Sequence, residues 1–256
     1  MPGQPLTLER IVWKLPFRKR RRSAKLPPGI RAYAIGDIHG RIDLLDKLLA
    51  KIDADALHEP AARTIEIYLG DYVDRGPASR EVIDRLLARA GRKETVFLKG
   101  NHEAFLQDFL HHPEVMADWS QCGGLQTLTS YGLAPSFNPD AKEQTALSRA
   151  LRAAFPAAHG AFLTGLVLYF ECGDFFFVHA GIRPGVPLDR QEEEDLLWIR
   201  EEFLLCDDAF KKMIVHGHTP VSAPEFRSNR INIDTGAYAT GRLTCLRIEG
   251  EQYSVL

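Results

Sequence analysis

The 256-residue chain has few cysteines, little net charge and no long apolar run. Its cysteines are far apart and form no Cys-x-x-Cys pair, which argues against a zinc ribbon or a dithiol redox motif. They are Cys122, Cys172, Cys206 and Cys245. A net charge of -2 gives the whole molecule no general attraction to polyanions. Without an apolar run long enough to cross a bilayer, the composition predicts a globular protein with no transmembrane segment.

The N-terminal segment departs from this charge balance. Residues 18–22 read Arg-Lys-Arg-Arg-Arg, and Pro27, Pro28 and Gly29 follow as a linker signal. We expect a solvated, basic, flexible arm over 1–29 and one folded domain over 30–256. The alternative is contact of this arm with nucleic acid or an anionic membrane, because apolar residues before the basic run could form an amphipathic helix. These charges follow the apolar stretch, so we expect no signal peptide and a cytoplasmic location.

A strand, a glycine-containing polar turn and a helix-patterned segment recur three times. The apolar strands at 31–35, 64–69 and 96–98 lead into Gly36-Asp37, Gly70-Asp71 and Gly100-Asn101. Strands rich in aromatic or β-branched residues follow in the second half, at 166–170, 175–178, 213–215, 231–233 and 243–248. The pattern predicts an α/β fold with two packed sheets flanked by helices. Ligands of such sheets collect at the carboxyl ends of the strands, where we expect the site.

Four short segments supply groups that bind metal ions. They are Gly-Asp-Ile-His-Gly at 36–40, Gly-Asp-Tyr-Val-Asp-Arg-Gly at 70–76, Gly-Asn-His-Glu at 100–103 and Val-His-Gly-His-Thr at 215–219. Taken alone, a pair such as Asp37 and His39 is more often a capping Asp with an incidental His. Together, these carboxylate, amide and imidazole groups suit two divalent ions that clamp both ends of an in-line attack on phosphorus. The segments therefore predict a two-metal phosphoesterase.

The ordered trio at 36–40, 70–76 and 100–103 resembles the phosphoprotein phosphatase branch of the calcineurin-like metallophosphoesterases, particularly the compact bacterial and phage serine/threonine phosphatases. The resemblance covers about residues 32 to 248. It implies a four-layer sandwich and two divalent ions, with Mn favoured and Fe, Zn or Co also compatible. By this likeness one ion is held by Asp37, His39 and Asp71, and the other by Asp71, Asn101, His179 and His218.

The same resemblance implies roles for four further residues. A water or hydroxide between the ions is the nucleophile, His102 is the general acid and Asp74 orients its imidazole. Arg75 and Arg200 are phosphate-binding groups, although Arg200 could instead form a surface ion pair. His216 corresponds to no ligand and is interpreted as a packing or hydrogen-bonding residue.

Two positions depart from the family pattern. Lys99 stands where many bacterial relatives have Arg, which replaces a bidentate donor by a point charge. Cys122 stands where relatives often have Asn. These departures bear on how phosphate is bound and oriented.

The resemblance predicts a serine/threonine protein phosphatase that acts on phosphoproteins or small phosphomonoesters. The alternative is hydrolysis of dinucleoside polyphosphates, as in Ap4A-type enzymes, or of nucleotide-capped RNA. Symmetrical dinucleoside tetraphosphatases tend to lack the Asp of Asp-Arg-Gly and to end the third motif in Asp. This chain has Asp74 and Glu103, which favours monoesters. A third hypothesis is a noncatalytic polyanion-binding module, against which the complete set of ligands and arginines argues.

Overall fold

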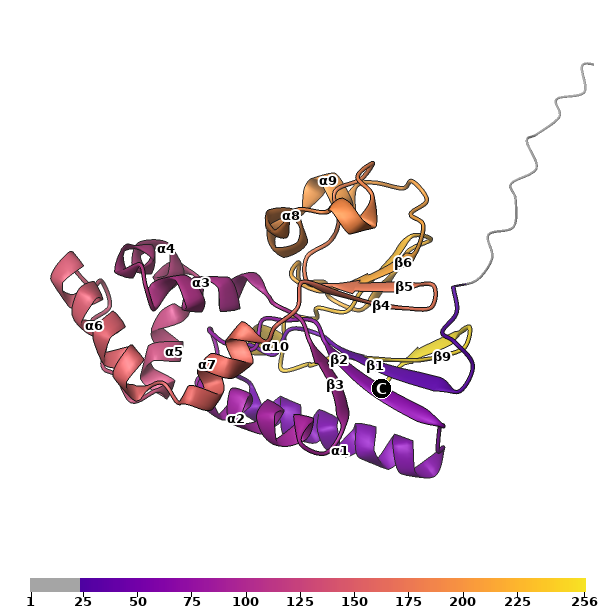
Figure 1. Cartoon of the computed structure of the whole chain (residues 1–256), viewed down its shortest axis with the longest axis horizontal. Coiled ribbons are helices and arrows are strands. Elements are labelled where there is room, and N and C mark those ends of the chain that lie inside the picture. Colours follow the sequence, from indigo (N-terminus) through magenta and orange to yellow (C-terminus); the bar gives the residue numbers. More distant parts are fainter. Residues whose placement is uncertain (1–23) are drawn as a thin grey trace, which may run out of the picture.

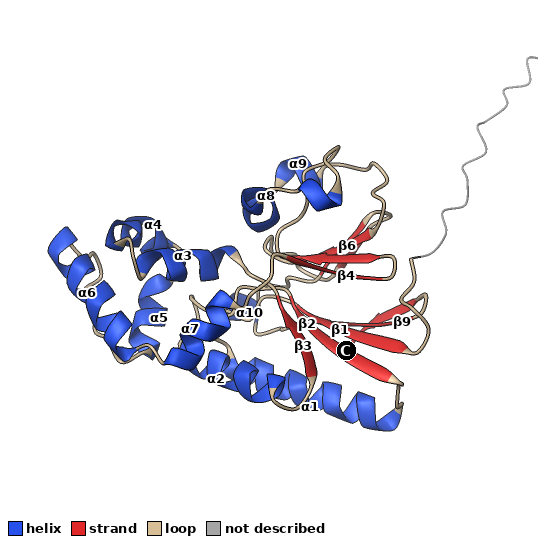
Figure 2. Cartoon of the chain, in the orientation of Figure 1, coloured by secondary structure: helices blue, strands red, loops and turns tan. Residues whose placement is uncertain are grey.

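Two five-stranded sheets lie face to face, with helices outside each of them (Figure 1). The computed structural model describes residues 24–256, so the basic run at 18–22 and the amphipathic segment before it lie outside the described residues. Figure 2 shows the resulting layers, from helices through two sheets to helices again. The predicted α/β class with two packed sheets is confirmed.

The first sheet has the strand order β10-β9-β1-β2-β3. Its strands are β1 (Ile30–Ile35), β2 (Arg63–Tyr68), β3 (Glu94–Phe97), β9 (Cys245–Glu249) and β10 (Gln252–Val255). β1, β2 and β3 run parallel, while β9 pairs antiparallel with β1. Alternate residues of β2 face opposite sides: Ile65 and Ile67 enter the core between the sheets, whereas Glu66 and Tyr68 face the outer helices.

The second sheet has the order β4-β5-β6-β8-β7. Its strands are β4 (Tyr169–Cys172), β5 (Phe175–Val178), β6 (Met213–His216), β7 (Glu225–Phe226) and β8 (Arg230–Asn232). β5 is buried along its whole length, with Phe175 and Phe177 facing the first sheet and Phe176 on the opposite face. On that opposite face lie η2 (Leu188–Arg190), α8 (Glu193–Trp198) and α9 (Glu201–Leu204).

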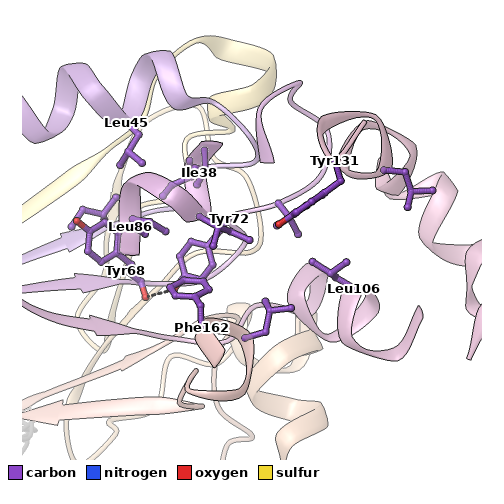
Figure 3. Packing of buried hydrophobic residues seen from close by; sticks show 14 of the residues in the cluster. Ile38, Leu45, Tyr68, Tyr72, Leu86, Leu106, Tyr131 and Phe162 are labelled. Atoms are coloured by element: carbon purple, nitrogen blue, oxygen red, sulfur yellow. Dashed lines mark hydrogen bonds between the residues drawn. The ribbon is translucent and has the colours of Figure 1, made fainter. Parts of the chain in front are cut away.

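The outer face of the first sheet is covered by α1 (Ile42–His58) and α2 (Ser79–Ala90). Between β3 and β4 the chain forms a helical section, which extends to one side of the sheets (Figure 1). It comprises α3 (Asn101–Phe109), η1 (Pro113–Val115), α4 (Met116–Gln121), α5 (Gly124–Ser130), α6 (Ala141–Ala154) and α7 (Ala157–Thr164). Figure 3 shows Tyr72, Leu106 and Phe162 packing where this section meets the sheet. The last helix, α10 (Ala237–Thr240), lies between β8 and β9.

Residues just before β1 also contact the sheets. Leu26 is buried in the core between them, and its amide donates to the carbonyl of Gly250 at 2.9 Å. Residues 24–256 contain no helix with the length and apolar character needed to cross a membrane. The boundary between the N-terminal arm and the folded domain at residue 30 stays a prediction. Leu26 lies before this boundary and is already packed between the sheets.

A buried ion pair joins α2 to the first sheet, and it provides a test of the packing. Arg89 donates to Glu66 at 2.6 Å and to Asp53 at 2.7 Å, and Glu66 is almost completely buried. Arg89→Met would leave the Glu66 carboxylate buried without its cation. We expect the free energy of unfolding, measured by urea denaturation, to fall by about 3 kcal/mol.

The matched control is Arg63→Met, which removes a pair with Glu94 at the surface of the same sheet. Both side chains of this pair are exposed, so the unfolding midpoint should not change measurably. Equal destabilisation by the two changes would contradict a special contribution from the buried pair.

Candidate metal centre and active site

The six candidate metal ligands all lie at the carboxyl ends of strands, and all six are buried. They follow β1 (Asp37 and His39), β2 (Asp71), β3 (Asn101), β5 (His179) and β6 (His218). The two sheets meet here directly, because the amide of His218 donates to Asp37 Oδ2 at 3.0 Å. The structure therefore brings the complete predicted set together.

Asp71 lies at the middle of the cluster. Its Oδ2 is 3.4 Å from His39 Nε2 and 3.7 Å from His102 Nε2, while its Oδ1 is 3.4 Å from His179 Nε2. Two groups of residues that could each hold a metal ion share this carboxylate. The first is His39, Asp71 and His102, and the second is Asp71, His179 and His218. One oxygen facing each group is the arrangement that a bridging carboxylate requires.

The imidazoles present lone pairs to the centre. His39 Nδ1 donates to the carbonyl of Val73 and His179 Nδ1 donates to that of Leu69, each at 2.9 Å, so Nε2 of both rings is an acceptor. His179 Nε2 lies 2.9 Å from Asn101 Oδ1, and two acceptors at that distance repel each other unless a cation lies beside both. Backbone carbonyls thus hold these rings in the orientation and tautomer that metal binding needs.

Burial keeps these imidazoles neutral. It lowers the pKa of His39 to about 3 and that of His218 to about 2. The pKa of His179 is also lowered by its burial. Neutral imidazole is the form that coordinates divalent ions, so the electrostatics of the cluster suit ligands rather than cations.

Buried carboxylates crowd the same space. Burial, followed by the charges of Asp234 and Asp71, raises the pKa of Asp37 well above its usual range. Burial also raises the pKa of Asp234 to about 6. Two polar atoms, Asp37 Oδ1 and His218 Nε2, are buried without any partner among the described residues. Unpartnered acceptors among crowded carboxylates fit a site for divalent cations.

Glu103 holds two of the ligand-bearing turns together. Its carboxylate accepts hydrogen bonds from the backbone amides of Asp71 (2.9 Å), Tyr72 (2.8 Å) and Gly100 (3.0 Å). Burial, followed by the charge of Asp71, raises its pKa to about 7. Sequence reasoning used Glu103 only to compare substrate classes and missed this positioning role. The available signal was its place in the third helical position after Gly100, where a glutamate commonly caps the helix start.

The backbone of the centre adopts unusual conformations. Among residues 24–256, five non-glycine residues have left-handed φ angles between 47° and 70°, and all five belong to the predicted site. They are His39, Asp71, Asp74, Arg75 and His218. Such conformations each cost roughly 1–3 kcal/mol and persist only where surrounding contacts enforce them, typically at functional sites. Two glycines leave room for carboxylates of the cluster. A Cβ atom on Gly100 would overlap the carboxylate of Asp71, and one on Gly217 would overlap that of Asp37.

His102 and Asp74 form the predicted pair. His102 Nδ1 lies 2.7 Å from Asp74 Oδ2, and Asp74 also accepts hydrogen bonds from Trp119 Nε1 at 2.7 Å and Thr127 Oγ1 at 2.5 Å. Burial acts to lower the pKa of His102, but the charge of Asp71 and the hydrogen bond with Asp74 outweigh it, so this pKa is raised. The ring is held in place and favours its protonated form. Trp119 and Thr127 were not identified from the sequence.

The two predicted arginines lie in different surroundings. Arg75 donates to His39 Nε2 at 2.9 Å, and its guanidinium also lies 3.2 Å from His102 Nε2, so this arginine is within the cluster. Arg200 is exposed and directly precedes α9. Burial and His179 lower the pKa of His218, and the charge of Arg200 is close enough to lower it further. Lys99 forms an ion pair with Glu193 at 2.7 Å.

His216 lies outside both ligand groups. It is buried edge-on against Phe203, with 5.0 Å between ring centroids, and its Nδ1 is 3.1 Å from the carbonyl of Gly217. Cys122 is half-buried in the turn before Gly123, whose carbonyl accepts from the amide of Arg75. Neither residue contributes a donor to the centre.

Comparison with known proteins identifies relatives over most of the chain. Residues 30–247 match the family model of the calcineurin-like phosphoesterases. Two similar proteins are each named bis(5'-nucleosyl)-tetraphosphatase PrpE (asymmetrical). The one from Anoxybacillus flavithermus is 29% identical over 83% of this chain and 88% of its own length. The one from Bacillus velezensis is 30% identical over 86% of this chain and 90% of its own length.

The fold is also similar to the crystal structure of a protein proposed to be a diadenosine tetraphosphatase. The TM-score is 0.61 at 21% identity, and the match covers 91% of this chain and 97% of that one. At this identity the likeness concerns the arrangement of the two sheets and their helices.

Asp71→Asn tests whether the shared carboxylate joins two metal sites. We expect the number of Mn²⁺ ions bound per chain, measured by equilibrium dialysis with elemental analysis, to fall from two to one or none. Because ions that bind only the folded state stabilise it, Mn²⁺ at one hundred times Kd should stabilise the wild-type protein by about 2.7 kcal/mol for each site, and the variant by less in total.

Asp43→Asn is the control for this measurement, because Asp43 is an exposed carboxylate that belongs to neither group of metal-binding residues. Its Mn²⁺ stoichiometry should match that of the wild-type protein. Full binding of two ions by Asp71→Asn would show that this carboxylate is not their common ligand.

Proposed function

The chain belongs to the calcineurin-like phosphoesterase family, whose members are hydrolases with a dinuclear metal centre, and from this we propose that it hydrolyses dinucleoside polyphosphates. In this proposal one nucleoside monophosphate and one nucleoside triphosphate leave from each dinucleoside tetraphosphate. The observation that carries the proposal is the position of Asp71, with one carboxylate oxygen facing each of two metal-binding groups.

The choice of substrate rests on the relatives. Both are named as asymmetrical bis(5'-nucleosyl)-tetraphosphatases. These names agree with the alternative prediction from the sequence, hydrolysis of dinucleoside polyphosphates, and not with a protein phosphatase. The sequence-based preference for monoesters rested on a comparison of Asp74 and Glu103 with the corresponding positions of symmetrical enzymes. That comparison does not separate monoesterases from asymmetrical enzymes, so by itself it favours neither class.

The residues of the centre have separate roles in the proposed reaction. Asp37, His39 and Asp71 would hold one ion, and Asp71, Asn101, His179 and His218 the other. When bound, such ions supply Lewis-acid charge and lower the pKa of a coordinated water. Mn²⁺ is the proposed ion, with Fe, Zn or Co also compatible with this donor set.

Arg75 and Arg200 would neutralise the phosphate chain, because guanidinium groups donate to phosphate oxygens in pairs. Water oxygen bonds to phosphorus and one bridging P–O bond breaks, so the electron pair leaves on the departing nucleotide and the water proton passes to solvent. His102, held by Asp74, can also give its proton to the leaving oxygen. The described cysteines are free thiols, which fits the proposed cytoplasmic location.

Product analysis tests this proposal. With Mn²⁺ and diadenosine tetraphosphate, we expect equal amounts of ATP and AMP by anion-exchange chromatography, and no product from Asp71→Asn. Formation of two ADP molecules would identify symmetrical cleavage. Phosphate release from a phosphoserine peptide without turnover of diadenosine tetraphosphate would instead identify a protein phosphatase.

A serine/threonine-type phosphomonoesterase is the second candidate, and the pair of His102 and Asp74 favours it. An alkoxide leaving group is strongly basic and needs a proton as it departs, whereas a nucleotide leaves as a weakly basic phosphate. A buried acid with a raised pKa is therefore of most use with monoesters. Both activities can share one centre, and the contribution of His102 to each distinguishes them.

Asp74→Asn measures that contribution. The charge of Asp71 and the hydrogen bond with Asp74 both raise the pKa of His102, and the change removes the second of these, so the ring should lose its proton at a lower pH. We expect kcat for a phosphoserine peptide to fall about 10²-fold and the alkaline limb of its pH profile to move to lower pH. The loss for diadenosine tetraphosphate should be smaller.

Asp118→Asn, on the exposed surface of α4, is the matched control and should leave both pH profiles unchanged. Equal losses of kcat for the two substrates would show that Asp74 supports the structure of the centre rather than proton transfer.

A further inference from the structure

Two aromatic side chains flank the candidate metal centre while remaining open to solvent. Tyr238 on α10 is 41% exposed, and Trp198 at the end of α8 is 39% exposed. Most other large aromatic residues of the described chain are buried in the cores. Both helices lie near the carboxyl-terminal edge of the sheets (Figure 1).

Each ring contacts a different end of the centre. The Tyr238 ring lies edge-on to His39, with 5.5 Å between centroids, and the Trp198 ring lies edge-on to His218 at 6.3 Å. His39 Nε2 lies near Oδ2 of Asp71, whereas His179 Nε2 lies near Oδ1. His218 is on the Oδ1 side, because Asn101 Oδ1 lies near both His179 and His218. The two aromatic residues therefore lie beside opposite halves of the predicted ligand set.

Other contacts hold both rings at these positions. The guanidinium carbon of Arg75 lies 4.7 Å from the Tyr238 ring centroid, within cation–π range. Phe105 supports Trp198 edge-on at 5.3 Å. A positioned, half-exposed ring next to arginine and metal ligands is a surface on which a nucleobase can stack while its phosphates reach the centre.

We propose that Tyr238 and Trp198 are the two nucleobase-binding positions of this protein, one for each nucleoside of a dinucleoside polyphosphate. This inference rests on the proposed hydrolysis of such substrates. The phosphate chain between the bases is anionic and belongs with Arg75, Arg200 and the metal ligands, while the bases are uncharged aromatic groups. Only a substrate with a base at each end uses both rings.

A series of substrates that differ in the number of bases tests the inference. Diadenosine tetraphosphate has two bases, adenosine 5'-tetraphosphate has one and inorganic tetraphosphate has none. Tyr238→Ala and Trp198→Ala should each lower kcat/KM for diadenosine tetraphosphate by about tenfold more than for inorganic tetraphosphate, mainly through KM. The double variant should show a selective loss of about a hundredfold, because the two positions act independently.

Conservative variants separate stacking from support of the fold. Tyr238→Phe and Trp198→Phe keep an aromatic face and should stay within about threefold of the wild-type value for every substrate. Tyr253→Ala is the matched surface control, because Tyr253 is 40% exposed and stacks on Phe226 in a different part of the molecule. Thermal unfolding of each variant verifies that it folds.

Two outcomes would overturn the inference, and they are distinguishable. Equal losses on all three substrates would show that the rings support the centre and bind no base, while the proposed function would stand. Absence of diadenosine tetraphosphate turnover by the wild-type enzyme would overturn the proposed function and the inference together.

Discussion

The burial of several carboxylates in one small volume is the constraint on which this centre depends. Asp37, Asp71 and Asp234 lie where water cannot solvate them, and Arg75 is the one guanidinium hydrogen-bonded within the described cluster. An isolated buried charge is strongly unfavourable, so the chain either keeps such groups protonated or places cations among them. Burial raises the pKa of Asp37 well above its usual range, which is the first of these responses. Divalent ions bound among the carboxylates would supply the second.

Holding that cluster in place requires a rigid framework, and the framework is mostly backbone. Carbonyls of Val73 and Leu69 fix two imidazoles, and the amides around Asp71 and Gly100 converge on the carboxylate of Glu103. These contacts keep ligand residues in left-handed conformations that an unsupported chain would leave. The chemistry therefore relies on turns whose geometry is set by neighbouring turns rather than by local sequence preference.

The layers could be predicted from the sequence, and so could the clustering of the candidate ligands, because both depend on local signals. A glycine and a polar residue directly after an apolar strand mark a strand end, and Asp37, Asp71 and Asn101 all follow this pattern. Strands without a buried face were harder to find. β10 was not predicted because it has only four residues and all of them are exposed, so its alternation of polar and apolar residues marks no buried face. β4 begins at Tyr169, later than predicted, because Val167 pairs with Leu98 instead.

Contacts between distant segments also escaped prediction. Trp119 and Thr127 bind Asp74 across about fifty residues of chain, and no local pattern marks such partners. Asp234 follows β8, and nothing around it in sequence indicates that its charge acts on Asp37 and Asp71. The position of Tyr238 beside His39 likewise depends on how α10 packs, which only the assembled fold defines.

The place of β9 in the first sheet has a consequence for biosynthesis. β1 is among the first described segments, but the neighbour that completes its second edge is formed by residues 245–249. A ribosome must therefore release residues 245–249 before this central strand is paired on both sides, and it must release His218 before that residue can meet Asp37. Until then the nascent polypeptide exposes an open strand edge, a known route to aggregation, and its proposed set of metal ligands is incomplete.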